Sequence, residues 1–481
     1  MPARAGRLRM TAPTPAGLTG LRSLFCQVFL GSALVACGGS SDGNPPAPTP
    51  APTPAPAPVP TPPPPAPAPT PVADCSSAAI GTQVGVWQDI TPAIFRTPAN
   101  MQTASVVVDP AHPGTVYASA GNNTNGGNPT TSSGIWKSSD CGAHWAKAST
   151  GQGSSAVDTG LVWEAKFDAS GGNFYIANGY GSPPALFRSS NGGVDWVDLF
   201  EGKSFTLSGD AKVGGPVPLT TAFQYGGFVQ GFSIDPTDAT QRHIVATFHE
   251  NCFDGVPAAQ GGWGLIGAAS NNGIGCLGET RDGGATWRLF ADEQPAQGWV
   301  EAATVTAIGT SSFLHVTPGG VYYTADAGAT WQPVSFTSDG GATYSPVTSA
   351  YSSYGEGTWL MPDGTLYLGT SSSGILVSKA VAGKALGSPR NWTQLANSPR
   401  TADIISDGTT LYAGWGIFDS SGQPFWSAPL ADPTHWTQST LATNPSVPAN
   451  GPNEYAYDAA NHVLYAAAYS GGLLRLVTQA P

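Results

Sequence analysis

The feature that most restricts the fold of this chain is an eight-residue pattern that occurs four times, at residues 138–145, 189–196, 280–287 and 324–331. Each copy reads Ser or Thr, any residue, Asp or Asn, any residue, Gly, any two residues, Trp. The acid or amide is expected to cap a tight turn, the Gly to take a positive φ, and the Trp to begin the next strand by packing under it. We therefore assign the pattern a structural role and no catalysis.

The pattern resembles the Asp box (BNR repeat) of sialidase-superfamily β-propellers. Each copy lies in a longer repeating unit of four expected strands, and seven such units can be counted. The expected innermost strands are residues 104–109, 164–168, 231–235, 305–310, 358–363, 403–407 and 454–458. We predict an all-β chain whose folded part, residues 84–481, is a single seven-bladed propeller. The last unit has three strands, and residues 86–90 are expected to add its fourth and close the ring. A six-bladed ring is the alternative.

The first 36 residues have the pattern of an export signal, with arginines before a short apolar run. Residues 34–38 resemble the lipobox of bacterial lipoproteins, which implies cleavage before Cys37 and lipidation of its thiol. The same resemblance implies attachment to the outer membrane, on its periplasmic or cell-surface side. A signal peptide with a chance cysteine is the alternative.

Residues 37–83 are predicted to be a disordered linker. From residue 45 to 71, 16 of 27 residues are proline, which cannot bury a core and favours an extended polyproline helix. At about 3.1 Å per residue this spacer spans roughly 80 Å.

Acidic residues dominate the charge. Beyond the signal the chain keeps 15 of its 19 basic residues against 31 acidic ones. This balance argues against binding nucleic acid, or a membrane surface by any means other than the lipid. We see no metal-spaced His/Cys cluster and no phosphate-binding loop, so neither a metal nor a cofactor is expected. A monomer is expected.

Four cysteines remain after the signal and the lipidation site are set aside. Three pairings are open, and we favour Cys75–Cys141 and Cys252–Cys276. Cys141 lies in a bottom turn of the first blade, and Cys75 precedes the closing strand beside it. The second pair would join the ends of a long loop of the third blade.

Function is expected on the top face, where the loops between second and third strands and the links between blades lie. The long segments 122–133, 203–230, 251–275 and 334–355 are placed there. Each innermost strand also begins with an acid or amide near the axis. These residues are Gln102, Glu164, Gln230, Glu301, Glu356, Asp403 and Glu454. They predict either an acidic funnel that supplies catalytic carboxylates or the polar wall of a water-filled channel.

Residues 226–238 resemble a catalytic-blade motif of xyloglucanase-type (family 74) glycoside hydrolases. The resemblance implies a carboxylate base one strand later, where this chain has His249 and Glu250 instead of the family's Asp. Those enzymes place the substrate between two propellers, and this chain has room for one. If the chain hydrolyses a glycan, our candidates are Glu250 with Glu301, Glu356 or Glu164.

Two further families share the repeat. Residues 95–98 are similar to the sialidase motif whose arginine binds sialate, which would give Arg96 that role, although an acidic funnel would repel this anion. Photosystem II assembly factors and sortilin-like receptor domains are non-enzymatic propellers that bind proteins or peptides.

We therefore expect a polysaccharide or other extracellular polymer to bind in the top funnel, with or without hydrolysis; a protein partner is the alternative. The candidate binding residues are His249, Trp263, Arg96, Asp403, Glu454, Tyr354 and Trp415.

Overall fold

The computed structural model describes residues 74–96, 102–121, 132–179, 185–207, 217–218, 228–249, 276–289, 304–317, 320–337, 341, 343–344, 357–370, 373–401, 403–414, 425–439, 452–468 and 472–479. All of these residues belong to one compact unit, residues 69–481. Among them, no helix is long and apolar enough to cross a membrane.

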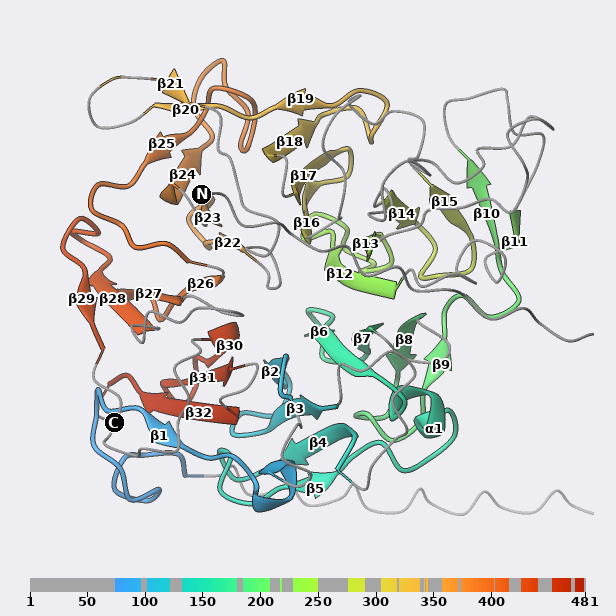
Figure 1. Ribbon diagram of the computed structural model, residues 1–481, viewed down its shortest axis with the longest axis vertical. Coiled ribbons are helices and arrows are strands. Elements are labelled where there is room, and N and C mark those ends of the chain that lie inside the picture. Colours follow the sequence, from blue (N-terminus) through green and yellow to red (C-terminus); the bar gives the residue numbers. More distant parts are fainter. Residues whose placement is uncertain are drawn as a thin grey trace, which may run out of the picture. The chain divides into compact units, whose positions relative to one another are not determined.

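Seven sheets, each with four antiparallel strands, stand around a common centre, which confirms the predicted seven-bladed β-propeller (Figure 1). Blade one contains β2 (Val106–Val108), β3 (Val116–Ala120), β4 (Gly134–Ser138) and β5 (Ala146–Lys147). Blade two contains β6 (Leu161–Phe167), β7 (Phe174–Gly179), β8 (Ala185–Ser189) and β9 (Val197–Asp198). Blade three contains β12 (Phe228–Ile234), β13 (Ile244–His249), β14 (Cys276–Thr280) and β15 (Trp287–Leu289). Blade four contains β16 (Thr304–Gly309), β17 (Ser312–Thr317), β18 (Gly320–Thr324) and β19 (Gln332–Pro333).

The remaining three blades follow the same order from the innermost strand outward. Blade five contains β22 (Thr358–Leu360), β23 (Thr365–Thr370), β24 (Gly374–Lys379) and β25 (Thr393–Gln394). Blade six contains β26 (Asp403–Ser406), β27 (Thr410–Gly414), β28 (Phe425–Pro429) and β29 (Thr437–Gln438). Blade seven contains β30 (Pro452–Asp458), β31 (Val463–Ala468), β32 (Gly472–Val477) and β1 (Gln88–Asp89). Two short helices connect strands, η1 (Ala93–Arg96) and α1 (Ser154–Val157).

The hydrophobic core lies between successive blades. Phe167 and Phe174 of blade two stack at 4.5 Å between ring centroids, and Tyr117 of blade one packs 5.0 Å from Phe174. Trp196, at the end of a repeat turn, is 3% exposed and packs against Phe174. Each sheet is therefore stabilised by burying its faces against its two neighbours.

The four repeat turns share one set of hydrogen bonds. In blade one, the Gly142 N–H donates to Ser138 Oγ at 2.9 Å and the His144 N–H donates to Asp140 Oδ1 at 2.8 Å. The same two bonds recur in blade four from Gly328 and Thr330. Gly142 and Gly328 have φ values of 83° and 88°, where a side chain would be strained.

The ring closes between its two ends in sequence. β1 pairs antiparallel with β32, and the disulfide Cys75–Cys141, with a Cα–Cα distance of 5.7 Å, confirms one predicted pairing. The buried Arg475 of β32 donates to Gln88 Oε1 at 2.9 Å and to the Cys141 carbonyl at 2.6 Å. Within the segment that the sequence analysis places in the linker, Cys75 forms this disulfide and the Ile80 carbonyl accepts a hydrogen bond from Arg475 Nη2 at 3.4 Å.

The described parts of two segments that we expected to be top-face loops contain hairpins that pair with the outer edges of blades. Segment 203–230 contains β10 (Ser204–Leu207) and β11 (Val217–Pro218), and β10 pairs in parallel with β15. Segment 334–355 contains β20 (Phe336–Thr337) and β21 (Thr343–Tyr344), and β20 pairs in parallel with β25. An exposed edge strand has unpaired backbone groups that such a hairpin satisfies.

Candidate functional site

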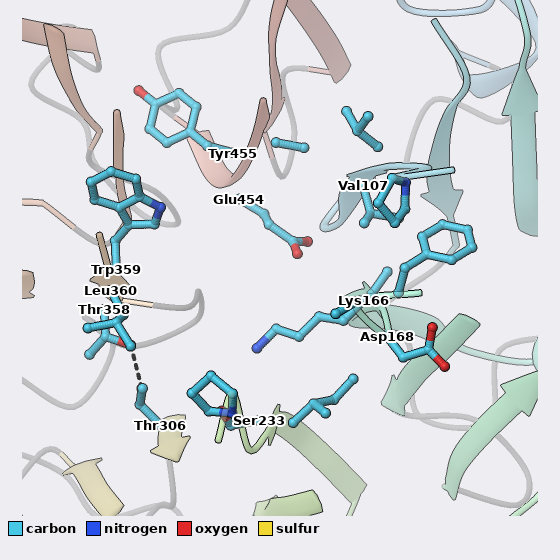
Figure 2. Close-up of a pocket in the computed structure, with 18 of the residues that line it drawn as sticks. Val107, Lys166, Asp168, Ser233, Thr306, Thr358, Trp359, Leu360, Glu454 and Tyr455 are labelled. Atoms are coloured by element: carbon cyan, nitrogen blue, oxygen red, sulfur yellow. Dashed lines mark hydrogen bonds between the residues drawn. The ribbon is translucent and has the colours of Figure 1, made fainter. Parts of the chain in front are cut away.

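A cavity of about 570 Å³ lies where the innermost strands converge. Residues from β2, β6, β12, β16, β22 and β30 line it, so six of the seven blades contribute (Figure 2). We call it the axial cavity. Most of its lining is aliphatic or hydroxyl-bearing, including Ser233, Thr306 and Thr358, with the aromatic residues Phe167, Trp359, Tyr455 and Tyr457.

Three carboxylates of the innermost strands accept backbone hydrogen bonds from the next blade. Glu164 accepts the Phe232 N–H, Asp403 accepts the Tyr455 N–H at 2.7 Å, and Glu454 accepts the Val106 N–H at 3.2 Å. All three side chains are buried. We call these contacts the inter-blade clasps.

The clasps recur at one position in the blade repeat. Each acid lies four residues before an Asp at the end of the innermost strand or directly after it, namely Asp168, Asp407 or Asp458. Other junctions use hydroxyl groups: the Ala307 N–H donates to Ser233 Oγ at 3.0 Å, and Thr306 and Thr358 are joined through their hydroxyl groups. A polar residue near the axis therefore joins neighbouring blades at several junctions.

Among the described residues that line the axial cavity, Lys166 is the one with a positive charge. Its Nζ pairs with Glu164 Oε1 at 2.5 Å and donates to the Phe232 carbonyl at 2.7 Å, and it lies 5.3 Å from the centre of the Phe232 ring. Figure 2 shows Lys166 and Glu454 extending into the cavity from β6 and β30. Glu164 is thereby held by both a cation and a backbone N–H.

Asp168, which directly follows β6, forms hydrogen bonds within the turn that connects β6 to β7. It accepts hydrogen bonds from the Asn173 amide at 2.6 Å, Ser170 Oγ at 2.7 Å and the Gly172 N–H at 2.9 Å. Burial acts to raise the pKa of Asp168, but these hydrogen bonds outweigh it and lower the pKa. The carboxylate therefore stays ionised near neutral pH.

We expect Glu454→Ala to lower the free energy of unfolding by about 2 kcal/mol, because it leaves the buried Val106 N–H without its acceptor. Glu454→Gln retains a carbonyl oxygen that can accept this hydrogen bond. We expect its loss in free energy of unfolding to be less than half of the loss for Glu454→Ala. Urea unfolding of both variants, with the exposed Glu201→Ala as control, measures the difference. Equal losses in the alanine and glutamine variants would contradict the clasp.

The structure places six of the predicted site residues by their side chains, and two of them, Cys75 and Cys141, form the disulfide described above. Glu164, Asp403 and Glu454 lie on the innermost strands β6, β26 and β30 and are engaged in the clasps. Arg96 instead pairs with Asp89 on β1, the outermost strand of blade seven. His249 ends β13 and Cys276 begins β14, but their side chains lie outside the described residues, as do Glu250, Glu301, Glu356, Trp263, Tyr354, Trp415, Cys252 and Cys37. The predictions for these residues stay predictions.

The sequence analysis missed two groups. Lys166 could have been found, because it follows Glu164 by two residues and therefore shares its face of the strand. The second group is a buried cluster in blade three. His243 Nδ1 lies 2.7 Å from Asp235 Oδ2, and His243 Nε2 lies 2.8 Å from Glu279 Oε1.

Two arginines complete this blade-three cluster. Arg281 and Arg288 pair with Glu279 at 2.6 and 2.5 Å. Burial alone lowers the pKa of His243, but its hydrogen bonds to Glu279 and Asp235 outweigh burial and raise the pKa. Burial alone raises the pKa of Glu279, but His243 and the two arginines lower it. Among the described residues, no group of His, Cys, Asp and Glu side chains could hold a metal ion.

The cluster predicts a pH-dependent contribution to stability. Because the folded-state pKa of His243 is raised, its contribution is complete below the unfolded value of about 6.5 and is lost as pH rises through the folded value. The pKa values of Asp235 and Glu279 are lowered, so their contributions are lost as pH falls below about 4.

We expect His243→Gln to cost about 3 kcal/mol near pH 5.5 and clearly less near pH 8.5. Urea unfolding of both proteins at the two pH values measures the difference. A loss that does not change with pH would show that folding does not raise the pKa of His243.

Comparison with known proteins finds similar solved structures but no similar sequence family. The sequence matches no protein-family model and no curated protein. Its fold is similar to that of YCF48 bound to D1 peptide, at 15% identity and a TM-score of 0.46, over 82% of this chain and 98% of that one. YCF48 from Cyanidioschyzon merolae is similar at 12% identity and a TM-score of 0.44, over 81% and 98%. The GH74 xyloglucanase from Xanthomonas campestris is similar at 16% identity and a TM-score of 0.28, over 78% and 58%. Identities this low concern the fold, and the function must be argued from the residues of this chain.

Proposed function

We propose that this chain is an exported lipoprotein, anchored to the outer membrane through Cys37, whose Asp-box propeller binds an extracellular glycan or related polymer without cleaving it. The linker would carry the propeller away from the membrane, and the axial cavity would receive a segment of the polymer. A glycan is the class of ligand that needs many weak hydrogen bonds and an apolar ring face, and no strong charge.

The proposal rests on the hydrogen bonds that the axial carboxylates Glu164, Asp403 and Glu454 already form. Glycoside hydrolysis needs one carboxylic acid and one carboxylate that are free to act on the substrate. Glu164, Asp403 and Glu454 instead accept the backbone N–H groups that join blades, and Glu164 also pairs with Lys166. Protonating or moving any of them would weaken an inter-blade clasp. Their geometry is therefore that of structural groups.

The lining of the axial cavity supports a sugar ligand. Its volume of about 570 Å³ is within the range of small-molecule sites. Ser233, Thr306 and Thr358 offer hydroxyl groups along one side, and Trp359 offers an aromatic ring that can pack against the apolar face of a sugar. These groups suit a neutral or weakly charged saccharide better than a strongly anionic one.

The test is a glycan panel applied to the mature chain from residue 37 with Cys37→Ser, compared with a variant whose axial cavity is filled. Val107 lines the cavity, and Val107→Trp would occupy part of it. Val197, which is 56% exposed on β9, provides the matched control Val197→Trp. We expect at least one glycan to bind the parent and the control with equal affinity. Its affinity for Val107→Trp should be at least tenfold lower, which corresponds to a loss of about 1.4 kcal/mol or more. Equal binding by all three proteins would place the glycan elsewhere.

Hydrolysis of the same polymer is the alternative that the sequence keeps open. It depends on Glu250 with Glu301 or Glu356, which lie outside the described residues. A protein partner in place of the glycan is a second alternative, and a panel in which no glycan binds would favour it.

A further inference from the structure

A second pocket lies on the outer part of blade five, apart from the axial cavity. Its volume is about 290 Å³, and its lining comes from the ends of β24 and β25, the segment between them, and Thr337 of β20. This connection is where blades one to four have the repeat turn. Blade five has residues 380–392 there, whereas residues 325–331 suffice in blade four. The longer connection therefore replaces a purely structural turn with a loop that forms a pocket.

Three cations line this pocket: Lys379, Lys384 and Arg390. No acidic residue lines it, although acidic residues outnumber basic ones by 31 to 19 in the whole chain. Among the described residues, none of the three cations forms an ion pair with a carboxylate, whereas Arg96, Lys147, Lys166, Arg281 and Arg288 each do. We call this site the blade-five basic pocket.

One carboxylate that does not line the pocket interacts electrostatically with one of its cations, Lys379. Asp363, on the turn between β22 and β23, has its pKa lowered mainly by hydrogen bonds from Thr365 and to a smaller extent by Lys379. The side chain of Asp363 is committed to the Thr365 N–H at 2.8 Å. The positive charge of the pocket is therefore left largely uncompensated.

The loop that carries the cations is ordered by its own hydrogen bonds. The Asn391 amide donates to the Lys379 and Ala385 carbonyls, both at 2.8 Å, and the buried Trp392 donates to the Gly387 carbonyl at 3.0 Å. Val381 and Lys384 exchange backbone hydrogen bonds. A fixed loop loses little conformational entropy when a ligand binds.

Arg390 adds evidence that the loop shape is maintained. Its φ is 63°, in the left-handed region that costs a non-glycine residue free energy. Its carbonyl accepts a hydrogen bond from Lys384 Nζ at 3.4 Å, so two of the three cations are connected. A strained cationic residue at the edge of a pocket is the kind of feature that binding sites retain.

We propose that the blade-five basic pocket binds an oxyanion, a sulfate or phosphate group carried by an extracellular polysaccharide. Ammonium and guanidinium groups supply charge-assisted hydrogen bonds to such groups, and the hydroxyls of Thr337 and Thr393 supply neutral ones. This site is separate from the axial cavity and does not depend on the function proposed for it. The same chemistry would accept a phosphate headgroup of a lipid, and the test distinguishes the two sources.

The test uses the mature chain from residue 37 with Cys37→Ser. One arm measures binding to dextran sulfate and to neutral dextran, with inorganic phosphate as competitor; the other measures binding to phosphatidylglycerol and phosphatidylcholine vesicles. The test variant is Lys384→Gln with Arg390→Asn, since asparagine tolerates a positive φ. The control, Lys203→Gln with Arg400→Gln, removes the same charge outside the pocket.

We expect dextran sulfate to bind the parent and the control within about twofold of each other, and the test variant at least about tenfold more weakly, as for two lost hydrogen bonds to charged groups. Inorganic phosphate should compete, and neutral dextran should not bind at this site. Binding to anionic vesicles alone, lost in the test variant, would retain the oxyanion site and make its source a lipid. Equal losses in the test and control variants, or no binding in either arm, would overturn the proposal. Because Val107→Trp leaves this pocket intact, its effect on glycan binding reports on the axial cavity separately.

Discussion

Replacing Trp87 by alanine is expected to lower the free energy of unfolding by about 4 kcal/mol, one of the two largest effects that we predict. The Trp87 side chain is 2% exposed. It packs against Phe425 of blade six at 4.8 Å and against Tyr455 of blade seven at 6.3 Å between ring centroids. It precedes β1, so it fixes the closing strand to both blades.

Trp87→Phe is the matched control. Among the described residues, the indole N–H of Trp87 has no hydrogen-bond partner, so phenylalanine removes an unsatisfied donor and retains most of the ring contacts. We expect it to cost about half as much as the alanine variant or less, because phenylalanine leaves a smaller cavity. Urea unfolding measures both variants. A small loss for Trp87→Ala would mean that the N-terminal segment contributes little to closure.

Removing the disulfide by Cys75→Ala with Cys141→Ala is expected to cost about 4 kcal/mol, the entropy that a cross-link between residues 66 positions apart removes from the unfolded chain. Alanine suits position 141, whose φ is 60°, because Ala327 occupies the same place in the blade-four turn with a φ of 58°. Both cysteines are buried beside the seam between blades seven and one.

Unfolding of the parent with and without a reductant provides an independent check of the disulfide. With the reductant present, the parent and the double variant should unfold at similar urea concentrations, both well below the oxidised parent. If the double variant matches the oxidised parent, the seam is held by β1 and Arg475 without help from the disulfide.

The sequence was sufficient to predict the seven blades, because local chemistry determines the repeat turns. A capping Asp or Asn, a Gly with positive φ and a Trp that packs beside the turn act within eight residues, so each copy marks the turn between the third and fourth strands of a blade. The Cys75–Cys141 pairing followed from the same reasoning, since the blade count places both residues at one seam.

The role of the axial carboxylates could not be predicted from the sequence. The repeat indicated that Glu164, Asp403 and Glu454 lie near the axis, but not that each faces a backbone N–H of the next blade. That contact depends on the rotation between neighbouring sheets, which no single repeat encodes. The pairing of β10, in segment 203–230, was not predicted for a similar reason. β10 pairs with β15 at the edge of blade three, and the two strands are far apart in the chain.

The blade-three cluster shows the same limit. His243 lies eight residues after Asp235 and 36 before Glu279, and the pairing of β13 with both β12 and β14 brings the three together. Isolated acids and histidines in a sequence therefore indicate polar positions without assigning them to clasps, ion pairs or catalysis.

The most direct test of the central claim is to incubate the glycan that binds the parent with the parent and with Glu250→Gln, and to measure both bound glycan and new reducing ends. We predict that both proteins bind the glycan equally and that it is recovered intact. Reducing ends produced by the parent and absent with Glu250→Gln would contradict this account and make the chain a glycoside hydrolase.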